Sequence, residues 1–160
     1  MLATAILPPP SPTFSRISAE SLQSAADALF AELARSDSST ALLSYFSRTE
    51  IVNLSVASGF NGEPPLHLTG LNGVRSYFDL VATHWKRSKM RLHHRHVCPD
   101  ALRVVLSASV TWTWKESGKS WREDFTCTLD YDDQILVKGF AIQTESGQQT
   151  CLMFAVDPDS

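Results

Sequence analysis

The chain has 160 residues, of which 43% are hydrophobic, so it is long enough to bury one core of its own. With 14 Lys and Arg against 17 Asp and Glu, its net charge of −3 gives no reason to expect a nucleic acid or an anionic membrane as partner. Its three cysteines lack a CxxC spacing, which indicates neither a disulfide scaffold nor a thiolate zinc site and fits a reducing compartment.

Residues 1–17 are rich in proline, which predicts a disordered, extended arm ahead of the domain. Within it, residues 2–7 are apolar, but this stretch is too short for a signal peptide and no basic residue precedes it. No window of 18 apolar residues exists, so we expect a cytoplasmic protein without a membrane span. The tail, 146–160, contains an apolar stretch that we expect to dock on this chain or on a partner.

Three helices are predicted in the first half of the chain. Ser18 is the predicted N-cap of the first, and its apolar residues follow helical spacing from Leu22 to Leu33. A second, short helix carries the apolar residues of 42–46, and a third runs over 71–85. A strand over 50–56 and a short extended piece over 66–68 lie between the second and third helices.

From about residue 89 the apolar period changes from 3.6 to 2, which predicts long antiparallel strands. With Ser117-Gly118 as a hairpin turn, Trp114 pairs with Trp121 and Trp112 pairs with Glu123. This register gives both strands one apolar face and one face of hydroxyl and charged residues, and a slip by one residue would destroy that match. A further turn at 132–133 leads into a last strand over 135–144.

The segment 68–78, which enters the third helix through Gly70 and Gly73, and the hairpin 125–142 with its acidic turn are similar to the nuclear transport factor two-like superfamily. The order of elements most resembles its SnoaL-like and scytalone-dehydratase-like branch. The resemblance covers 18–145 and implies an α+β, cone-shaped domain, with a curved mixed or antiparallel sheet wrapped around three N-terminal helices. It also implies a pocket between sheet and helices, and commonly a homodimer.

Aromatic residues on the apolar face of the predicted hairpin are candidates for ligand binding. They are Trp112, Trp114, Trp121 and Phe125, which could wall a pocket for a hydrophobic molecule or simply form core or a dimer contact. Tyr45 and Tyr77, on the predicted helical side, could donate hydrogen bonds to a ligand carbonyl, although tyrosines at helical spacing are commonly core.

Three residues are candidate catalytic groups. His94 and His96 alternate along the strand that begins near residue 89, on the same predicted apolar face as Met90 and Leu92, where imidazoles could transfer protons. The alternative is that they are structural histidines at the sheet edge. Glu123 falls on the apolar face of the hairpin, where loss of hydration would raise its pKa and suit acid–base catalysis, unless it lies exposed at the hairpin tip.

No metal site is predicted, because only His94 and His96 could share an ion and no third ligand accompanies them. A basic cluster, with five Lys and Arg residues between 86 and 95, could steer an anionic ligand or simply be a solvated surface. The resemblance offers two catalytic patterns. The sequence has no inward Asp like the base of ketosteroid isomerases, and it matches scytalone dehydratases only in residue types.

Two functions remain open from the sequence. The first is an isomerase, dehydratase or cyclase that binds a small hydrophobic molecule and uses acid–base chemistry without a cofactor. The second is a non-catalytic, dimeric ligand carrier or protein-interaction module. In either case we expect a homodimer formed through the open face of the sheet, and neither a nucleic acid nor a membrane as partner.

Overall fold

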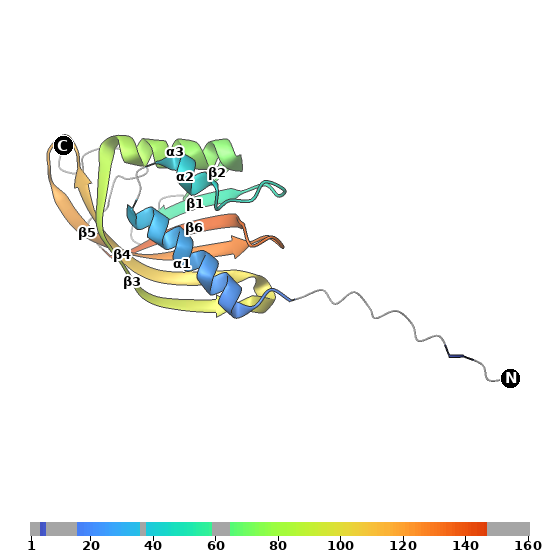
Figure 1. Ribbon diagram of the computed structural model, residues 1–160. Coiled ribbons are helices and arrows are strands. Elements are labelled where there is room, and N and C mark those ends of the chain that lie inside the picture. The colour runs from blue at the N-terminus through green and yellow to red at the C-terminus, as the bar shows by residue number, and fades with distance from the viewer. Residues whose placement is uncertain (1–3, 6–15, 36–37, 59–64, 147–160) are drawn as a thin grey trace.

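The computed structural model describes residues 4–5, 16–35, 38–58 and 65–146. The predictions for the proline-rich arm and for the apolar tail fall almost entirely outside these residues. Within them, the chain forms three α-helices and a six-stranded mixed sheet that is not closed. This confirms the predicted α+β class, and Figure 1 shows the helices lying together on one side of the curved sheet.

The helices form where the apolar spacing predicts them. Helix α1 (Ala19–Arg35) begins after Ser18, whose Oγ accepts a hydrogen bond from the Ser21 N–H at 3.1 Å, so the predicted N-cap is confirmed. Helix α2 (Ser39–Leu43) is a short turn, and α3 (Gly70–His84) buries one apolar stripe against the sheet. Gly70 opens α3 with a φ of +78°, a backbone conformation that favours glycine.

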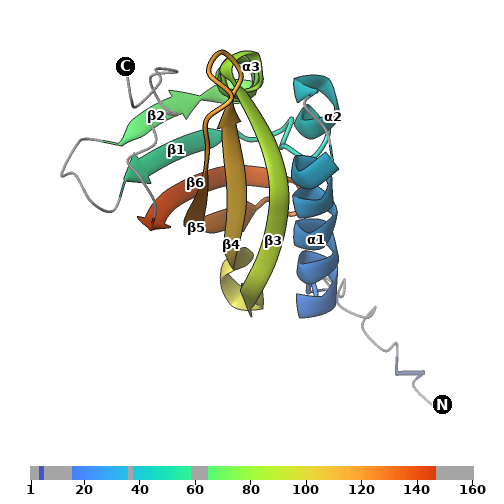
Figure 2. The ribbon, with the colours of Figure 1, turned by 90° about the vertical axis from the view of Figure 1, so that its left-hand side faces the viewer.

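The sheet has the strand order β2-β1-β6-β5-β4-β3. Strand β1 pairs in parallel with β6 and all other neighbours pair antiparallel. The bounds are β1 (Asn53–Ser58), β2 (Leu66–Thr69), β3 (Trp85–Cys98), β4 (Arg103–Trp114), β5 (Ser120–Tyr131) and β6 (Val137–Ser146), with a 3₁₀ turn, Pro99–Ala101, before β4. The first and last strands therefore begin later than predicted. In Figure 2, α1 runs beside β3, and α3 is seen end-on where β3 begins.

The β4–β5 register differs from the predicted one by two residues. Trp112 pairs with Trp121, and Glu123 pairs with Val110, so the predicted pairs Trp114–Trp121 and Trp112–Glu123 are wrong. Because the shift is even, each side chain keeps its predicted face. The apolar residues of both strands therefore still point toward the helices.

A longer turn causes this shift. Instead of two residues, the five residues 115–119 connect the strands, and Thr113 pairs with Ser120. The Trp114 N–H donates to the Lys119 carbonyl at 2.8 Å, and the Gly118 N–H donates to the Trp114 carbonyl at 2.8 Å. Gly118 has a φ of +73°, which a glycine adopts without strain.

Strand β3 is irregular in two places. Its pairing with β4 shifts between Ser88 and Arg91 and again between Leu92 and His94. Lys89, inside the first irregularity, has a φ of +51°, which is unusual for a residue other than glycine. Each irregularity interrupts the simple alternation of faces, so the side-chain directions predicted for β3 cannot hold along its whole length.

Candidate functional site

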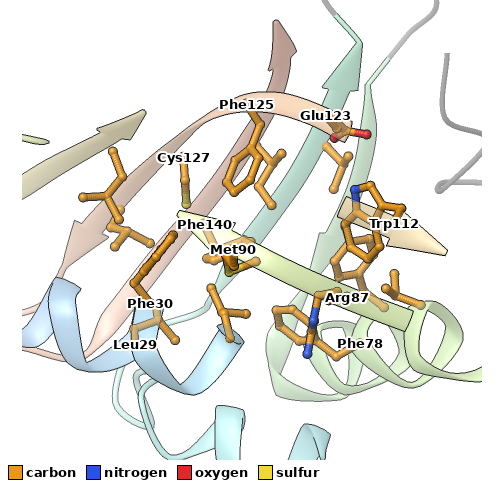
Figure 3. Close-up of a pocket in the computed structure, with 17 residues that line it drawn as sticks. Leu29, Phe30, Phe78, Arg87, Met90, Trp112, Glu123, Phe125, Cys127 and Phe140 are labelled. Carbon is orange, nitrogen blue, oxygen red and sulfur yellow. The ribbon is translucent and has the colours of Figure 1, made fainter. Parts of the chain in front are cut away.

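A cavity of about 40 Å³ lies between the inner face of the sheet and the helices. Water needs roughly 10–15 Å³ of such volume, so the cavity has room for a few waters but not for a larger molecule without widening. Figure 3 shows side chains from α1, α3 and several strands converging on it. Its lining is mostly apolar, and includes Leu29, Phe30, Tyr77, Phe78, Arg87, Met90, Trp112, Glu123, Phe125, Cys127, Phe140 and Ile142.

Glu123 is buried in this apolar setting, with only 2% of its surface exposed. Strand β5 places it on the inner face, and the Thr144 Oγ1 hydroxyl of β6 donates to its Oε1 at 3.1 Å. The alternative that Glu123 lies exposed at the hairpin tip is therefore wrong. The tip is formed by the turn at residues 115–119. Its catalytic role stays a prediction.

Besides Glu123, the lining contains one hydroxyl group, that of Tyr77 in α3, and one further charged group, that of Arg87 in β3, among the described residues. Burial raises the pKa of Tyr77 well above its ordinary value, the negative charge of Glu123 raises it further, and the Arg87 guanidinium lowers it. Both charges therefore lie close enough to act on the phenol. With a raised pKa, Tyr77 stays protonated at neutral pH and can only donate its O–H proton or accept as a neutral hydroxyl.

The sequence analysis assigned Arg87 only to the basic cluster. It did not predict that Arg87 lines the cavity. The signal existed, because Arg87 lies two residues after Trp85, which begins a strand and is 1% exposed. Residues two apart share a face of a strand, and Arg87 pairs with the inward Trp112. Met90, Phe30 and Cys127 were also missed as lining residues.

The predicted aromatic residues divide into two groups. Trp112 and Phe125 line the cavity, whereas Trp114 and Trp121 pack against Trp85 with ring centroids 4.7 and 4.9 Å away from it. These two rings support the end of the sheet rather than the cavity wall. Of the predicted tyrosines, Tyr77 lines the cavity.

Tyr45 is half-buried outside the lining, and its backbone carbonyl accepts the Val137 N–H at 2.8 Å.

The inward orientation predicted for His94 and His96 is wrong. The irregularity between Leu92 and His94 reverses the alternation, so that His94 pairs with Ser107 and His96 pairs with Val105, on the outer face of β4. Both imidazoles are exposed, and neither lines the cavity. The neighbouring His93 makes a hydrogen bond of 2.8 Å between its Nε2 and the Ser109 Oγ of the same outer face.

Two further observations limit the chemistry of the site. Burial raises the pKa of the Cys127 thiol to about 12, so this cysteine is a poor nucleophile near neutral pH. Across the described ranges of the chain, no group of three or more His, Cys, Asp or Glu side chains is arranged to hold a metal ion.

None of the described helices has the length and apolar character needed to cross a membrane.

No protein-family model matches the sequence, and a search of curated proteins gives no significant match. Solved structures do match the fold. PrhC from Penicillium brasilianum aligns with a TM-score of 0.67 and 15% identity, over 86% of this chain and 89% of PrhC. The pinacolase BvnE from Penicillium brevicompactum aligns with a TM-score of 0.63 and 14% identity, over 85% of this chain and 92% of BvnE.

A third structure is SalBIII, an epoxide hydrolase/cyclase-like enzyme in pyran ring formation of the polyether salinomycin. It aligns with a TM-score of 0.62 and 11% identity, over 79% of this chain and 92% of SalBIII. The chain has the nuclear transport factor two-like fold. At these identities the likeness establishes the fold and leaves the activity to be argued from the site.

Proposed function

We propose that the protein is an enzyme of the isomerase or cyclase type, which binds a small hydrophobic molecule and moves a proton on it through Glu123. The observation that carries this proposal is the burial of a carboxyl group, 2% exposed, in the wall of an otherwise apolar cavity. Removing a carboxyl group from water costs free energy, and buried titratable groups in the wall of a cavity are common at functional sites.

The surroundings of Glu123 suit proton transfer. A carboxylate can take a proton from a carbon next to a carbonyl group, and the resulting acid can return the proton at another position, which is an isomerisation. The Thr144 hydroxyl orients the carboxyl through Oε1. Tyr77, which burial keeps protonated, can donate a hydrogen bond to a substrate oxygen on which negative charge develops.

The structural neighbours support the reaction class. Two of them are a pinacolase and an epoxide hydrolase/cyclase-like enzyme of pyran ring formation. Those activities are theirs. For this chain they favour a reaction started by an acid or a base of the protein within an apolar pocket.

A ligand must widen the cavity to enter. Met90 of β3 and Phe30 of α1 are the side chains best suited to move: the methionine has an unbranched, flexible side chain, and both residues are only partly buried. Because Met90 belongs to an irregular stretch of β3 at the edge of the sheet, its displacement need not break a regular strand pair.

The proposal can be tested without the natural substrate. Cyclohexanone is a small, hydrophobic ketone, and a base in the pocket should exchange its α-hydrogens for deuterium in D₂O, measured by mass spectrometry. We expect the wild-type protein to accelerate this exchange and Glu123→Gln to lose the acceleration. Glu116→Gln, at an exposed position of the hairpin turn, is the matched control and should behave as wild type.

A ligand carrier is the second candidate, favoured by the mostly apolar lining of the cavity. It predicts that cyclohexanone binds while its α-hydrogens exchange only at the background rate. That result, or an acceleration that survives in Glu123→Gln, would overturn the enzymatic proposal.

A further inference from the structure

Four tryptophans have buried indole nitrogens without a hydrogen-bond acceptor in the described part of the chain. They are Trp85, Trp112, Trp114 and Trp121. A buried N–H that lacks an acceptor costs free energy, so an acceptor that can reach it would bind favourably. Of the four, Trp112 is the one that lines the cavity, and 7% of its surface is exposed.

The sheet register places Trp112 beside Glu123. Glu123 pairs with Val110, and Trp112 follows Val110 by two residues on the same inner face. Such diagonal neighbours are about 7–8 Å apart, a separation that leaves room for a small group between them. Figure 3 shows the nitrogen-bearing edge of the Trp112 indole on the side that faces Glu123.

The two groups complement each other chemically. The indole N–H is only a donor, whereas an ionised carboxylate is only an acceptor. A molecule held between them could direct an acceptor oxygen at the Trp112 N–H and a C–H or O–H group at Glu123.

We infer that the Trp112 Nε1–H group is the donor that recognises the substrate, and that the substrate is a hydrophobic molecule with an acceptor oxygen such as a ketone, epoxide or ether. The inference takes from the proposed function only that this cavity is the binding site. It does not require that Glu123 performs catalysis. The indole thereby orients the oxygen, and the orientation fixes which hydrogen of the ligand faces the carboxyl group.

Two probes of nearly equal shape separate this recognition from simple burial. Cyclohexanone carries an exocyclic oxygen where methylenecyclohexane carries a CH₂ group. Indole N–H signals in a ¹H–¹⁵N spectrum, assigned with Trp→Phe variants, report hydrogen bonding at each ring. We expect cyclohexanone to move the Trp112 signal downfield, and methylenecyclohexane to leave it nearly in place.

The affinities provide a second readout. Trp112→Phe keeps an aromatic ring and removes the donor, so it should reduce the preference for cyclohexanone over methylenecyclohexane by about 3- to 10-fold. Trp114→Phe is the matched control, because its indole nitrogen is also buried and unpartnered but lies outside the cavity lining. It should leave the preference unchanged.

Equal shifts of the Trp112 signal with both probes, or an unchanged preference in Trp112→Phe, would overturn the inference. Glu123→Gln separates this failure from that of the proposed function. If Trp112 is the donor, the downfield shift persists in Glu123→Gln whether or not deuterium exchange is lost.

Discussion

Thr144 and Glu123 are joined by a buried hydrogen bond between neighbouring strands, in which the Thr144 Oγ1 hydroxyl donates to Glu123 Oε1 at 3.1 Å. Both side chains are more than nine-tenths buried, with exposed fractions of 7% and 2%. The bond fixes the orientation of the carboxyl group toward the cavity, and a donor of this kind stabilises the charged form of its partner.

Thr144→Val should therefore alter the pH dependence of catalysis. The substitution keeps the shape and removes the donor, which disfavours the carboxylate. Because proton abstraction needs the carboxylate, the rising limb of the pH–rate profile for deuterium exchange should move to higher pH. Thr144→Ser retains the hydroxyl and should keep the wild-type profile. An identical profile for the valine variant would mean that this bond does not act on the reacting group.

Asp132 should make stability depend on pH. Burial alone would raise the pKa of Asp132, but hydrogen bonds from the Ser47 hydroxyl (2.6 Å) and from the Leu136 and Gln134 N–H groups (2.9 Å each), together with the charge of Lys138, lower it below the ordinary value. A carboxyl with a lowered pKa stabilises the fold above its unfolded pKa, and the contribution is lost as the pH falls through the folded one.

Asp132→Asn should accordingly lower the free energy of unfolding at pH 7 by about 1–3 kcal/mol. The difference from wild type should shrink as the pH falls below about 4. Urea denaturation at several pH values measures this, and the exposed neighbour Asp133→Asn is the control. A difference that stays constant down to pH 2 would show that the charge of Asp132 does not carry the effect.

Tyr131→Phe should leave stability unchanged or raise it, by up to about 2 kcal/mol. The side chain is 1% exposed and its hydroxyl is buried without a hydrogen-bond partner among the described residues. Removing the hydroxyl therefore removes an unpaired polar group and leaves the ring in place. Chemical denaturation measures the change, and a loss of more than about 1 kcal/mol would reveal an acceptor for the hydroxyl.

His94→Ala and His96→Ala should leave deuterium exchange within about twofold of wild type, as expected for exposed positions away from a site. Both imidazoles are on the outer face of the sheet. The same assay and the same cyclohexanone probe apply. A large loss in either variant would place the proton transfer outside the cavity around Glu123.

Alternation of apolar and polar residues was sufficient to predict much of this site. It placed Trp112, Glu123 and Phe125 on one inward face, and that face survived a register error because the error was even. Helical spacing likewise predicted that Tyr77 points into the core. Both predictions depend only on the direction of side chains within a regular element.

Features that depend on irregular backbone could not be predicted in the same way. The five-residue hairpin turn and the two irregularities of β3 are set by how whole strands twist and pack, and no motif marks them. The irregularity between Leu92 and His94 accounts for the wrong faces of His94 and His96. The homodimer remains a prediction, since it depends on a second chain.

The proposed function and the further inference both require that a small hydrophobic molecule binds in the cavity between the sheet and the helices. Nuclear Overhauser effects between bound cyclohexanone and the ¹³C-labelled protein test it directly, at a ligand concentration suited to an affinity on the order of millimolar. We expect contacts from the ligand to the Met90 methyl group and to the rings of Trp112 and Phe125. Contacts confined to the outer face, such as to the exposed Ile51, or none at saturation, would contradict it.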